Sequence, residues 1–353
     1  MENPYLSARQ RSIGIGIGVA LLAWMAGENI GHAQTVPSAE AQARQWAADY
    51  IRPAQVMHPA DNTPTPARTL LGKTLFFDPR LSDNQEMSCA TCHNPAQMWQ
   101  DGVPLPMGAV MKVMSRRTPP LLNLAWGGPY TWDGRAATLE GQALGPITSP
   151  AIMNLPADQM VERLRKIDGY ALLFERAYPG EKITPKTVGK AIAVFERSLV
   201  SGTAPFDEWA AGNANAMSDS AKRGFVVFNT KGNCAGCHAG WRFTDDGFYD
   251  IGIPGNDRGR GKIVQTVKAM EFAFKTPTLR DVADRAPYMH NGSVPTLEAV
   301  VDHYNRGGAV ARATLAPTVR KLNLTAVEKA DLVAFLKALT GTVAPVDIPG
   351  LPQ

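Results

Sequence analysis

The sequence contains very little cysteine, with only four cysteines among 353 residues. All four belong to two copies of one pattern, Cys89-Ala90-Thr91-Cys92-His93 and Cys234-Ala235-Gly236-Cys237-His238. Because neither pair is left free, a framework of structural disulfides is excluded. In an exported chain this spacing is typical of covalent c-type haem attachment, in which each thiol adds to a haem vinyl group and the histidine ligates the iron. We therefore expect two covalently bound haems c, with His93 and His238 as metal ligands.

Two other uses of cysteine pairs compete with haem attachment. Zinc ribbons usually place their cysteine pairs ~15–20 residues apart, whereas these two pairs lie far apart in the chain. A thioredoxin-like redox pair does not call for a histidine after both copies. The repeated histidine therefore favours haem over a zinc site or a redox dithiol.

The apolar run near the N-terminus, residues 13–26, is shorter than the ~20 residues that a membrane-spanning helix needs. Arg9 and Arg11 precede the run, and Gly31-His32-Ala33 follows it as a candidate cleavage site. This order is typical of a secretory signal peptide. We therefore predict a signal peptide over residues 1–33, a periplasmic mature protein and no stable membrane span after cleavage. An uncleaved N-terminal anchor is the alternative.

A strong excess of charge of either sign is also missing. The formal net charge is +4, and the propionates of two haems would roughly cancel it. The charge balance therefore gives no case for nucleic acid as a partner.

Signals for β-strands are sparse, whereas helix signals recur along the chain. Thr184 and Pro185 supply an N-cap and a first-turn proline before apolar residues at helical spacing. Thr325 and Glu328 form a candidate capping box before a second apolar stripe. Loops rich in glycine and proline separate the helical segments, and the proline-containing tail over residues 343–353 is expected to be extended. The sequence therefore predicts a mostly α fold with long loops.

The chain repeats itself. Arg117 matches Lys275 and Glu140 matches Glu298, so the offset is 158 residues without a gap. Each copy lies downstream of its own haem motif, which favours two tandem cytochrome c-like haem domains. We place the N-terminal domain at residues 34–205 and the C-terminal domain at residues 206–353.

Several motifs together resemble the bacterial dihaem cytochrome c peroxidase family, which includes the MauG-like enzymes. They are the two haem motifs, Trp132-Asp133-Gly134-Arg135-Ala136, Gln142-Ala143-Leu144-Gly145-Pro146 and the stretch 275–308. The resemblance covers residues 71–308. It implies that the N-terminal haem meets peroxide and that the C-terminal haem handles electron transfer. It also implies two catalytic residues, Trp132 between the haems and Gln142 as the distal glutamine.

Tyr304 departs from the simple peroxidases of this family. Its position matches the methionine that ligates their C-terminal haem, and the MauG-like enzymes have tyrosine there. A tyrosinate stabilises the higher oxidation states of iron, whereas a thioether favours the reduced state. Tyr304 is therefore the expected second ligand of that haem, with His303, His290 and Met289 as competitors. His303 would point elsewhere if residues 297–304 are helical.

The N-terminal haem also differs from that of the peroxidases that need reductive activation. Those enzymes cap this iron with a histidine, and the matching residue here is Ala109. No histidine lies between His93 and His238. An iron open to peroxide is therefore expected, with methionine ligation as the alternative; the methionines of this loop are Met107, Met111 and Met114.

A proton-transfer group is also missing from its usual place. The family has a glutamate ten residues after the distal glutamine, and this chain has Ile152 there. Proton transfer by a placed side chain contributes typically ~10²–10⁴-fold to a rate, so turnover as an ordinary peroxidase is expected to suffer. Glu140 is a candidate substitute, unless it is simply exposed on a helix.

The family normally holds a calcium ion between its haems through an asparagine and two backbone carbonyls. Arg117 stands at the asparagine position, and Arg285 and Pro287 would supply the carbonyls. A guanidinium has no acceptor and cannot ligate a cation. Arg117 is therefore expected to replace the charge of the ion rather than to bind it, although calcium remains the alternative.

These observations predict a periplasmic dihaem oxidoreductase of the MauG-like branch. It would react with hydrogen peroxide at the N-terminal haem and draw electrons through the C-terminal haem from a periplasmic donor, either a small cytochrome or a protein oxidised at an aromatic residue. The alternatives are an ordinary cytochrome c peroxidase and a non-catalytic dihaem electron carrier.

Overall fold

A computed structural model describes residues 39–353, which belong to one compact unit. The predicted signal peptide lies outside these residues. None of the helices within residues 39–353 is both long and apolar enough to cross a membrane.

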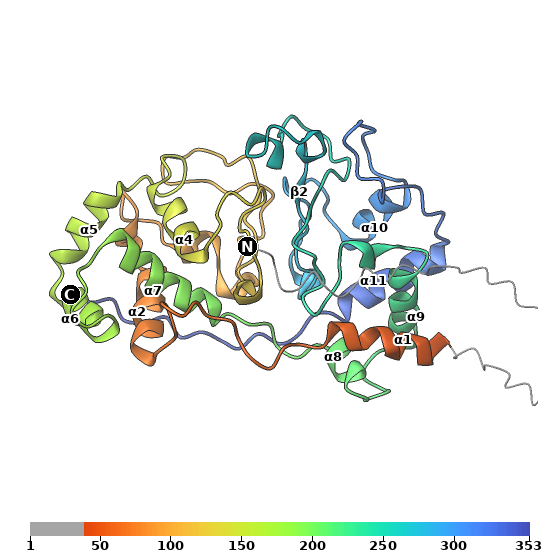
Figure 1. Cartoon of the computed structure of the whole chain (residues 1–353), viewed down its shortest axis with the longest axis horizontal. Helices are drawn as coiled ribbons and strands as arrows, with labels where there is room; N and C mark the ends of the chain where they lie inside the picture. The colour runs from red at the N-terminus through yellow and green to blue at the C-terminus, as the bar shows by residue number, and fades with distance from the viewer. Residues whose placement is uncertain (1–38) are drawn as a thin grey trace, which may run out of the picture. The chain divides into compact units, whose positions relative to one another are not determined.

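The regular structure of this unit is mostly helical, as expected. The helices are α1 (Ala39–Ala47), α2 (Pro66–Phe77), α3 (Cys89–Cys92), α4 (Leu139–Thr148), α5 (Ala157–Arg165), α6 (Asp168–Ala177), α7 (Pro185–Arg197), α8 (Pro205–Ala210), α9 (Asp219–Asn229), α10 (Leu297–Asn305) and α11 (Ala326–Lys337). Two short strands, β1 (Phe248–Tyr249) and β2 (Phe274–Lys275), pair antiparallel. Long irregular segments connect these elements (Figure 1).

The two helix starts predicted from caps are confirmed. At the start of α7 the Thr187 amide donates to Thr184 Oγ1 at 3.2 Å. At the start of α11 the Glu328 amide donates to Thr325 Oγ1 at 3.2 Å, and the Thr325 amide donates back to Glu328 Oε2 at 2.7 Å. These bonds satisfy amides that a helix N-terminus leaves without intrahelical partners.

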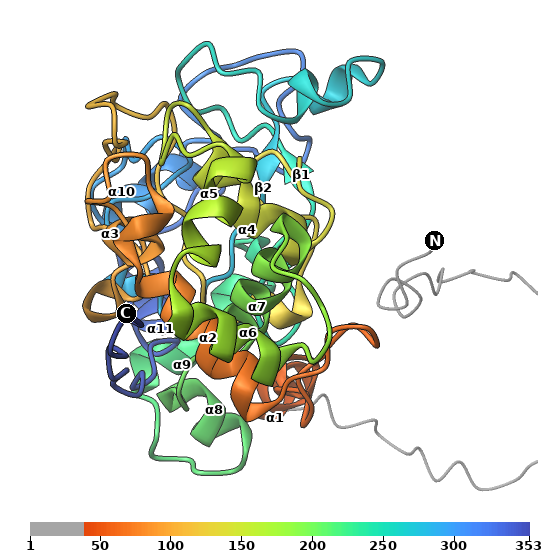
Figure 2. The ribbon, with the colours of Figure 1, turned by 90° about the vertical axis from the view of Figure 1, so that its left-hand side faces the viewer.

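Buried hydrophobic side chains form two large clusters. The first involves α2, α4, α5, α6 and α7, and Figure 2 shows α2, α6 and α7 close together, in agreement with their contacts. The second involves α1, α8, α9, α10 and α11, with α9 packed against α11. The two haem motifs therefore stand at separate hydrophobic clusters, Cys89 at the first and Cys234 at the second.

Each end of the described chain packs against the cluster formed mainly by the other half of the chain. Ala43 and Ala47 of α1 pack into the second cluster, although they precede the first cluster in the sequence. The tail beyond α11 has no helix or strand, and Val343 and Val346 pack on the first cluster. The Gly169 amide of α6 donates to the carbonyl of Gln353 at 3.0 Å. The proposed division between residues 205 and 206 remains a prediction.

The sequence repeat is also a structural repeat. Equivalent peptide bonds, Gly128–Pro129 and Ala286–Pro287, are both cis, and equivalent antiparallel bridges join Tyr130 to Ala136 and Tyr288 to Val294. The hydroxyl of each of these tyrosines donates to a carbonyl six residues earlier, at 3.3 Å to Leu124 and 3.0 Å to Val282. α4 and α10 follow at matching places, each capped by a threonine.

The two copies of the repeat bind each other reciprocally. The backbone amide of Arg117 donates to the carbonyl of His290 at 2.8 Å, and the amide of Lys275 donates to the carbonyl of Trp132 at 2.8 Å. Arg117 is the repeat equivalent of Lys275, and Trp132 is the equivalent of His290. The segment around Trp132 is therefore fixed directly to the second copy.

Candidate haem sites and the tryptophan between them

The two motif histidines are oriented in the same way. His93 Nδ1 lies 3.0 Å from the carbonyl of Trp99, and His238 Nδ1 lies 2.8 Å from the carbonyl of Phe243. A proton on Nδ1 makes each of these contacts a hydrogen bond and leaves Nε2 as the free ligand. Burial lowers the pKa of both rings, which favours the neutral imidazole that binds metals. Both histidines are therefore prepared as iron ligands.

Short helical turns hold the cysteines beside these histidines. Ser88 and Thr91 cap α3, where the Ser88 amide donates to Thr91 Oγ1 at 3.0 Å. In the second motif a 3₁₀ turn, Cys234–Gly236, begins after Asn233 in the left-handed conformation. In both motifs the histidine amide donates to the carbonyl of the first cysteine at 2.9 Å. The same hydrogen bond therefore folds each histidine back onto its cysteines.

The state of the four thiols argues against a redox dithiol. Burial raises the pKa of Cys92 to about 11, of Cys234 to about 12 and of Cys237 to about 11, and it also raises that of Cys89. Redox-active cysteines need a lowered pKa. Within residues 39–353, no three His, Cys, Asp or Glu side chains come together to hold a metal ion.

The second motif opens onto a large cavity, here called the C-terminal cavity. Cys234, Cys237, His238 and Tyr304 line it, and it contains about 1350 Å³ of space free of protein atoms, part of it open to solvent. Most of the remaining lining residues are apolar or aromatic. A haem, which is large and mostly apolar, fits this cavity and its donors.

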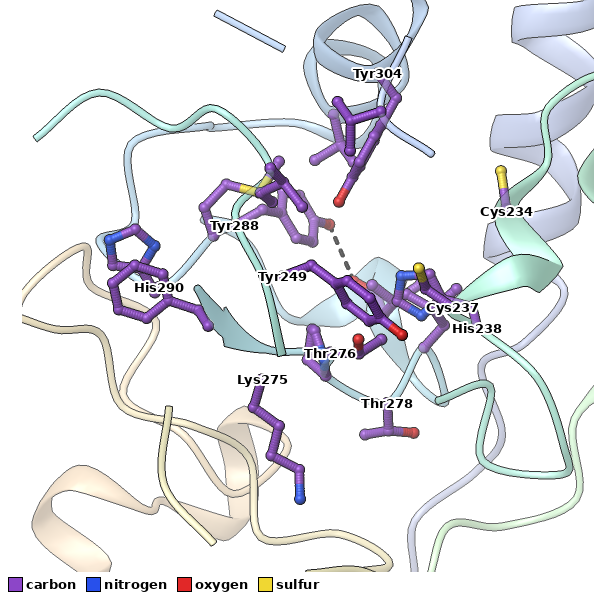
Figure 3. Close-up of a pocket in the computed structure, with 18 of the residues that line it drawn as sticks. Cys234, Cys237, His238, Tyr249, Lys275, Thr276, Thr278, Tyr288, His290 and Tyr304 are labelled. Atoms are coloured by element: carbon purple, nitrogen blue, oxygen red, sulfur yellow. Dashed lines mark hydrogen bonds between the residues drawn. The ribbon is translucent and has the colours of Figure 1, made fainter. Parts of the chain in front are cut away.

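Tyr304 of α10 points its hydroxyl into the cavity that holds His238 (Figure 3). Burial raises the pKa of Tyr304, and the nearby Cys237 and Cys234 add to the rise. A tyrosinate at this place would therefore need a cation beside it, and a ferric haem iron would supply one. The structure thus brings together the pair of ligands expected from the sequence.

The competing ligands divide into two groups. His303 Nε2 lies 2.8 Å from the carbonyl of Ile251, and this histidine does not line the cavity, so the expectation that it points elsewhere is confirmed. His290 and Met289 do line the cavity. His290 is stacked on Phe274, with the ring centroids 3.5 Å apart and the planes 8° from parallel. This stacking occupies one face of the His290 ring.

A second cavity, here called the N-terminal cavity, contains His93 and Gln142. Its empty space is about 760 Å³, again part of it open to solvent. Among the described residues that line it, His93 is the one histidine, and neither a methionine nor a cysteine is present. The cavity therefore offers one imidazole ligand and a glutamine amide, with no second imidazole or thioether.

Trp132 lines both cavities. Its indole Nε1 donates to the carbonyl of Arg117 at 2.8 Å, and its own carbonyl accepts from the Lys275 amide at 2.8 Å. The side chain is 9% exposed. The indole is therefore held in one orientation between the two candidate haem sites, where the resemblance placed it.

The loop that carries Ala109 lies against the segment that carries Ile152. The Ala109 amide donates to the carbonyl of Ile152 at 2.6 Å, and a Cβ on Gly108 would lie 1.9 Å from the carbonyl oxygen of Ala151. Met107 and Met111 are 45% and 76% exposed, and Met114 also stays outside the N-terminal cavity. Methionine ligation of the N-terminal iron therefore has no support from these contacts.

Glu140 does not replace the missing glutamate. Its carboxylate forms a salt bridge with Arg197 at 2.6 Å and accepts from Asn62 Nδ2 at 2.9 Å. Burial alone would raise the pKa of Glu140, but the hydrogen bonds from Arg197 and Asn62 hold it below its usual value. The group is ionised and held in a salt bridge with Arg197, so it is unsuited to donate a proton to peroxide.

Glu196 is a buried acid that the sequence reasoning missed. It is 4% exposed on α7, and its Oε2 has no hydrogen-bond partner. Burial raises the pKa of Glu196 to about 8, which favours the protonated form of the carboxyl group. Residues 187–197 of α7 are all buried, so Glu196 is enclosed with the rest of the helix, and no pattern in the sequence indicated this.

The residues at the expected calcium position do not fit a calcium ion. Arg117 Nη2 donates to the carbonyl of Arg285 at 2.7 Å and also contacts Gln100 Oε1. One of the two carbonyls that the resemblance assigns to the ion is therefore already bound by a cation of the chain itself. The guanidinium offers no oxygen in return.

Comparisons with known proteins agree with this geometry. A family described as di-haem cytochrome c peroxidase matches residues 66–215, and a RoxA-like, cytochrome c-like family matches residues 273–309. The chain is 51% identical over 308 residues to the methylamine utilization protein MauG of Methylorubrum extorquens, covering 86% of this chain and 87% of that protein. The chain belongs to the MauG-like dihaem cytochrome c peroxidase family. It is therefore a dihaem c-type oxidoreductase.

Two further relatives support this membership. MauG of Methylophilus methylotrophus is 47% identical over 307 residues, covering 86% of this chain and 91% of that protein. A crystal structure of a MauG-like protein associated with microbial copper homeostasis is 32% identical, with a TM-score of 0.74, covering 83% of this chain and 94% of that one. The mostly helical, cytochrome c-like fold expected from the sequence is thus shared with a solved member of the family.

Proposed function

We propose that this protein reduces hydrogen peroxide at the N-terminal cavity and takes the electrons from a partner protein by way of the C-terminal cavity. One peroxide takes up two electrons and two protons to give two water molecules, and the partner protein is oxidised because it gives up those two electrons. Haem iron, when bound at the two sites, supplies the redox chemistry. Because two relatives are named for methylamine utilization, we propose that the partner is a protein of that process.

The observation that carries this proposal is the position of Trp132. It lines the cavity of His93 and Gln142 as well as the cavity of His238 and Tyr304. A polarizable aromatic ring between two redox sites shortens the gap that an electron or a hole has to cross. The hydrogen bond from its Nε1 to the backbone carbonyl of Arg117 fixes the ring in that gap.

The other residues of the chain have separate tasks in this proposal. Gln142 offers an amide to peroxide in the N-terminal cavity. Among the described residues that line this cavity, His93 is the one histidine and there is no methionine. Tyr304 and His238 serve as the ligands on the C-terminal side. We also propose that residues 1–33 direct export to the periplasm, where c-type haem attachment and the protein partner would be found.

Two observations favour this proposal over its alternatives. An ordinary cytochrome c peroxidase would have a methionine in place of Tyr304 and a glutamate in place of Ile152. A non-catalytic electron carrier would cap both irons, and the described lining of the N-terminal cavity offers no second histidine or methionine for a cap. The proposal therefore predicts a high-spin N-terminal haem.

The test is the reaction of the fully oxidised holoprotein with one equivalent of peroxide. We expect the high-spin absorption to change without prior reduction, and the spectrum of the C-terminal haem to follow. Trp132→Phe should leave the first change and slow the second. Trp209→Phe is the matched control, because Trp209 is also buried but does not line either cavity. A wild-type protein that reacts only after one haem has been reduced would refute the proposal.

A further inference from the structure

The side chains of Arg117 and Lys275 extend the reciprocal bonding of the two repeats. Arg117 Nη2 donates to the carbonyl of Arg285 in the second copy at 2.7 Å. Lys275 Nζ donates to the carbonyl of Pro129 in the first copy at 2.5 Å. Each of these equivalent residues thus places a positive charge on a carbonyl of the opposite copy, in addition to the backbone bonds described above.

Both cations belong to residues that are hydrogen-bonded to Trp132, and Trp132 lines both cavities. Arg117 is 5% exposed and lines the C-terminal cavity, whereas Lys275 lines both cavities. Trp132 connects them, since its Nε1 donates to the carbonyl of Arg117 and its carbonyl accepts from the amide of Lys275. Movement of either residue would therefore change the orientation of the indole.

The charges of the two residues are balanced differently. Lys275 forms a salt bridge with Asp246 at 2.8 Å, which offsets part of the cost of its burial. Arg117 has no salt bridge among the described residues, its Nε has no hydrogen-bond partner, and burial lowers its pKa. A buried cation that contacts a carbonyl and an amide oxygen has the same kinds of neighbours as a bound calcium ion.

We propose that the Arg117 guanidinium is a permanent replacement for the inter-haem calcium ion of this family, and that together with Lys275 it holds Trp132 in position. The chain then carries the positive charge between its haem sites in covalent form. Electron transfer between the two haems is consequently independent of calcium. This inference does not depend on peroxide being the substrate.

The decisive measurement is calcium binding by the dihaem holoprotein after treatment with a chelator. For wild type, we expect no calcium uptake in a calorimetric titration, and neither the melting temperature nor the electron paramagnetic resonance spectrum should change with chelator or calcium. Stoichiometric calcium uptake by wild type, or a low-spin signal that is lost on chelation and restored by calcium, would overturn the proposal.

Arg117→Asn tests the replacement directly, because it restores an oxygen ligand and frees the carbonyl of Arg285. This variant should bind calcium, and its melting temperature should rise when calcium is added. Arg117→Lys keeps a positive charge and should stay unresponsive. Arg117→Asn holoprotein with both haems and no response to calcium would contradict the proposal; if the variant fails to fold, the wild-type titration alone still decides.

Arg52→Asn is the matched control. Arg52 Nη2 also donates to backbone carbonyls, of Ser201 at 2.7 Å and of Gly202 at 3.0 Å, but it does not line either cavity. Removing this guanidinium should not create a calcium response. A response equal to that of Arg117→Asn would show that the effect is not specific to the inter-haem position.

Discussion

The backbone amide of Ala109 donates a hydrogen bond of 2.6 Å to the carbonyl of Ile152. These are the two positions at which the sequence lacks residues expected from the peroxidases of its family, a capping histidine and a proton-transferring glutamate. Their backbones lie side by side, although 43 positions separate Ala109 from Ile152 in the numbering. The two departures therefore belong to one place in the structure, and a substitution at either position acts on the same pair of adjoining segments.

Replacing Ile152 with glutamate should accelerate the reaction with peroxide. The hydrogen bond to Ala109 uses only the backbone of residue 152 and survives the change, while the new carboxyl group can move a proton, an effect worth typically ~10²–10⁴-fold. Stopped-flow absorption of the oxidised protein measures the rate. Ile152→Gln is the control, because glutamine has nearly the same size as glutamate but carries no acidic group. Equal rates for the two variants, with haem content unchanged, would exclude the missing carboxyl group as the cause of slow reaction.

Replacing Tyr304 with methionine should raise the reduction potential of the C-terminal haem, because a thioether favours the reduced state of iron more than a tyrosinate does. Potentiometry and the low-spin signal in electron paramagnetic resonance measure the change. His303→Gln serves as the adjacent control, since His303 is bound to the carbonyl of Ile251. If Tyr304→Met and Tyr304→Phe both leave the signal unaltered, another residue such as Met289 or His290 ligates the iron.

Replacing Cys89 and Cys92 together with alanine should leave one covalent haem per chain. Each motif folds its histidine onto its own cysteines, with a hydrogen bond of 2.9 Å in both, so loss of one motif does not remove the thiols of the other. The pyridine haemochrome assay and the intact mass measure the haem content. The finding of fewer than two covalent haems in the wild-type holoprotein would refute the assignment of both motifs.

Glu196 should make the stability of the protein fall with rising pH. Burial raises its pKa from 4.5 in the unfolded chain to about 8 in the folded protein, so between these values only the folded state keeps the proton. The resulting stabilisation is complete below pH 4.5 and is lost as the pH rises through about 8, by up to about 1.4 kcal/mol per pH unit.

Melting temperatures of wild type and Glu196→Gln between about pH 5 and pH 8 test this linkage. The slope with pH should be smaller in the variant. Glu162→Gln is the control, because Glu162 is exposed and paired with Lys166. An identical pH slope in wild type and Glu196→Gln would show that Glu196 is ionised in the folded state.

Much of the site follows from local sequence. The haem motifs need only residues that are adjacent in the chain, because the thiols and the histidine of each motif are held by one short turn. The caps at Thr184 and Thr325 are likewise set by groups three residues apart. The repeat between Arg117 and Lys275 was also visible in the sequence, since each copy folds into the same local pattern of bridge, turn and helix.

Contacts between distant segments were decided only by the tertiary structure. Spacing along the chain does not show that Glu140 is paired with Arg197, that Glu196 is buried without a partner for Oε2, or that α1 packs into the second hydrophobic cluster. Nor does it show that Arg117 and Lys275 each donate to a carbonyl of the other copy. The sequence by itself determined which chemical groups the protein carries, because haem attachment and helix capping are local. Packing decided which of those groups are ionised, buried or free to act, because burial and pairing depend on neighbours that are remote in the chain.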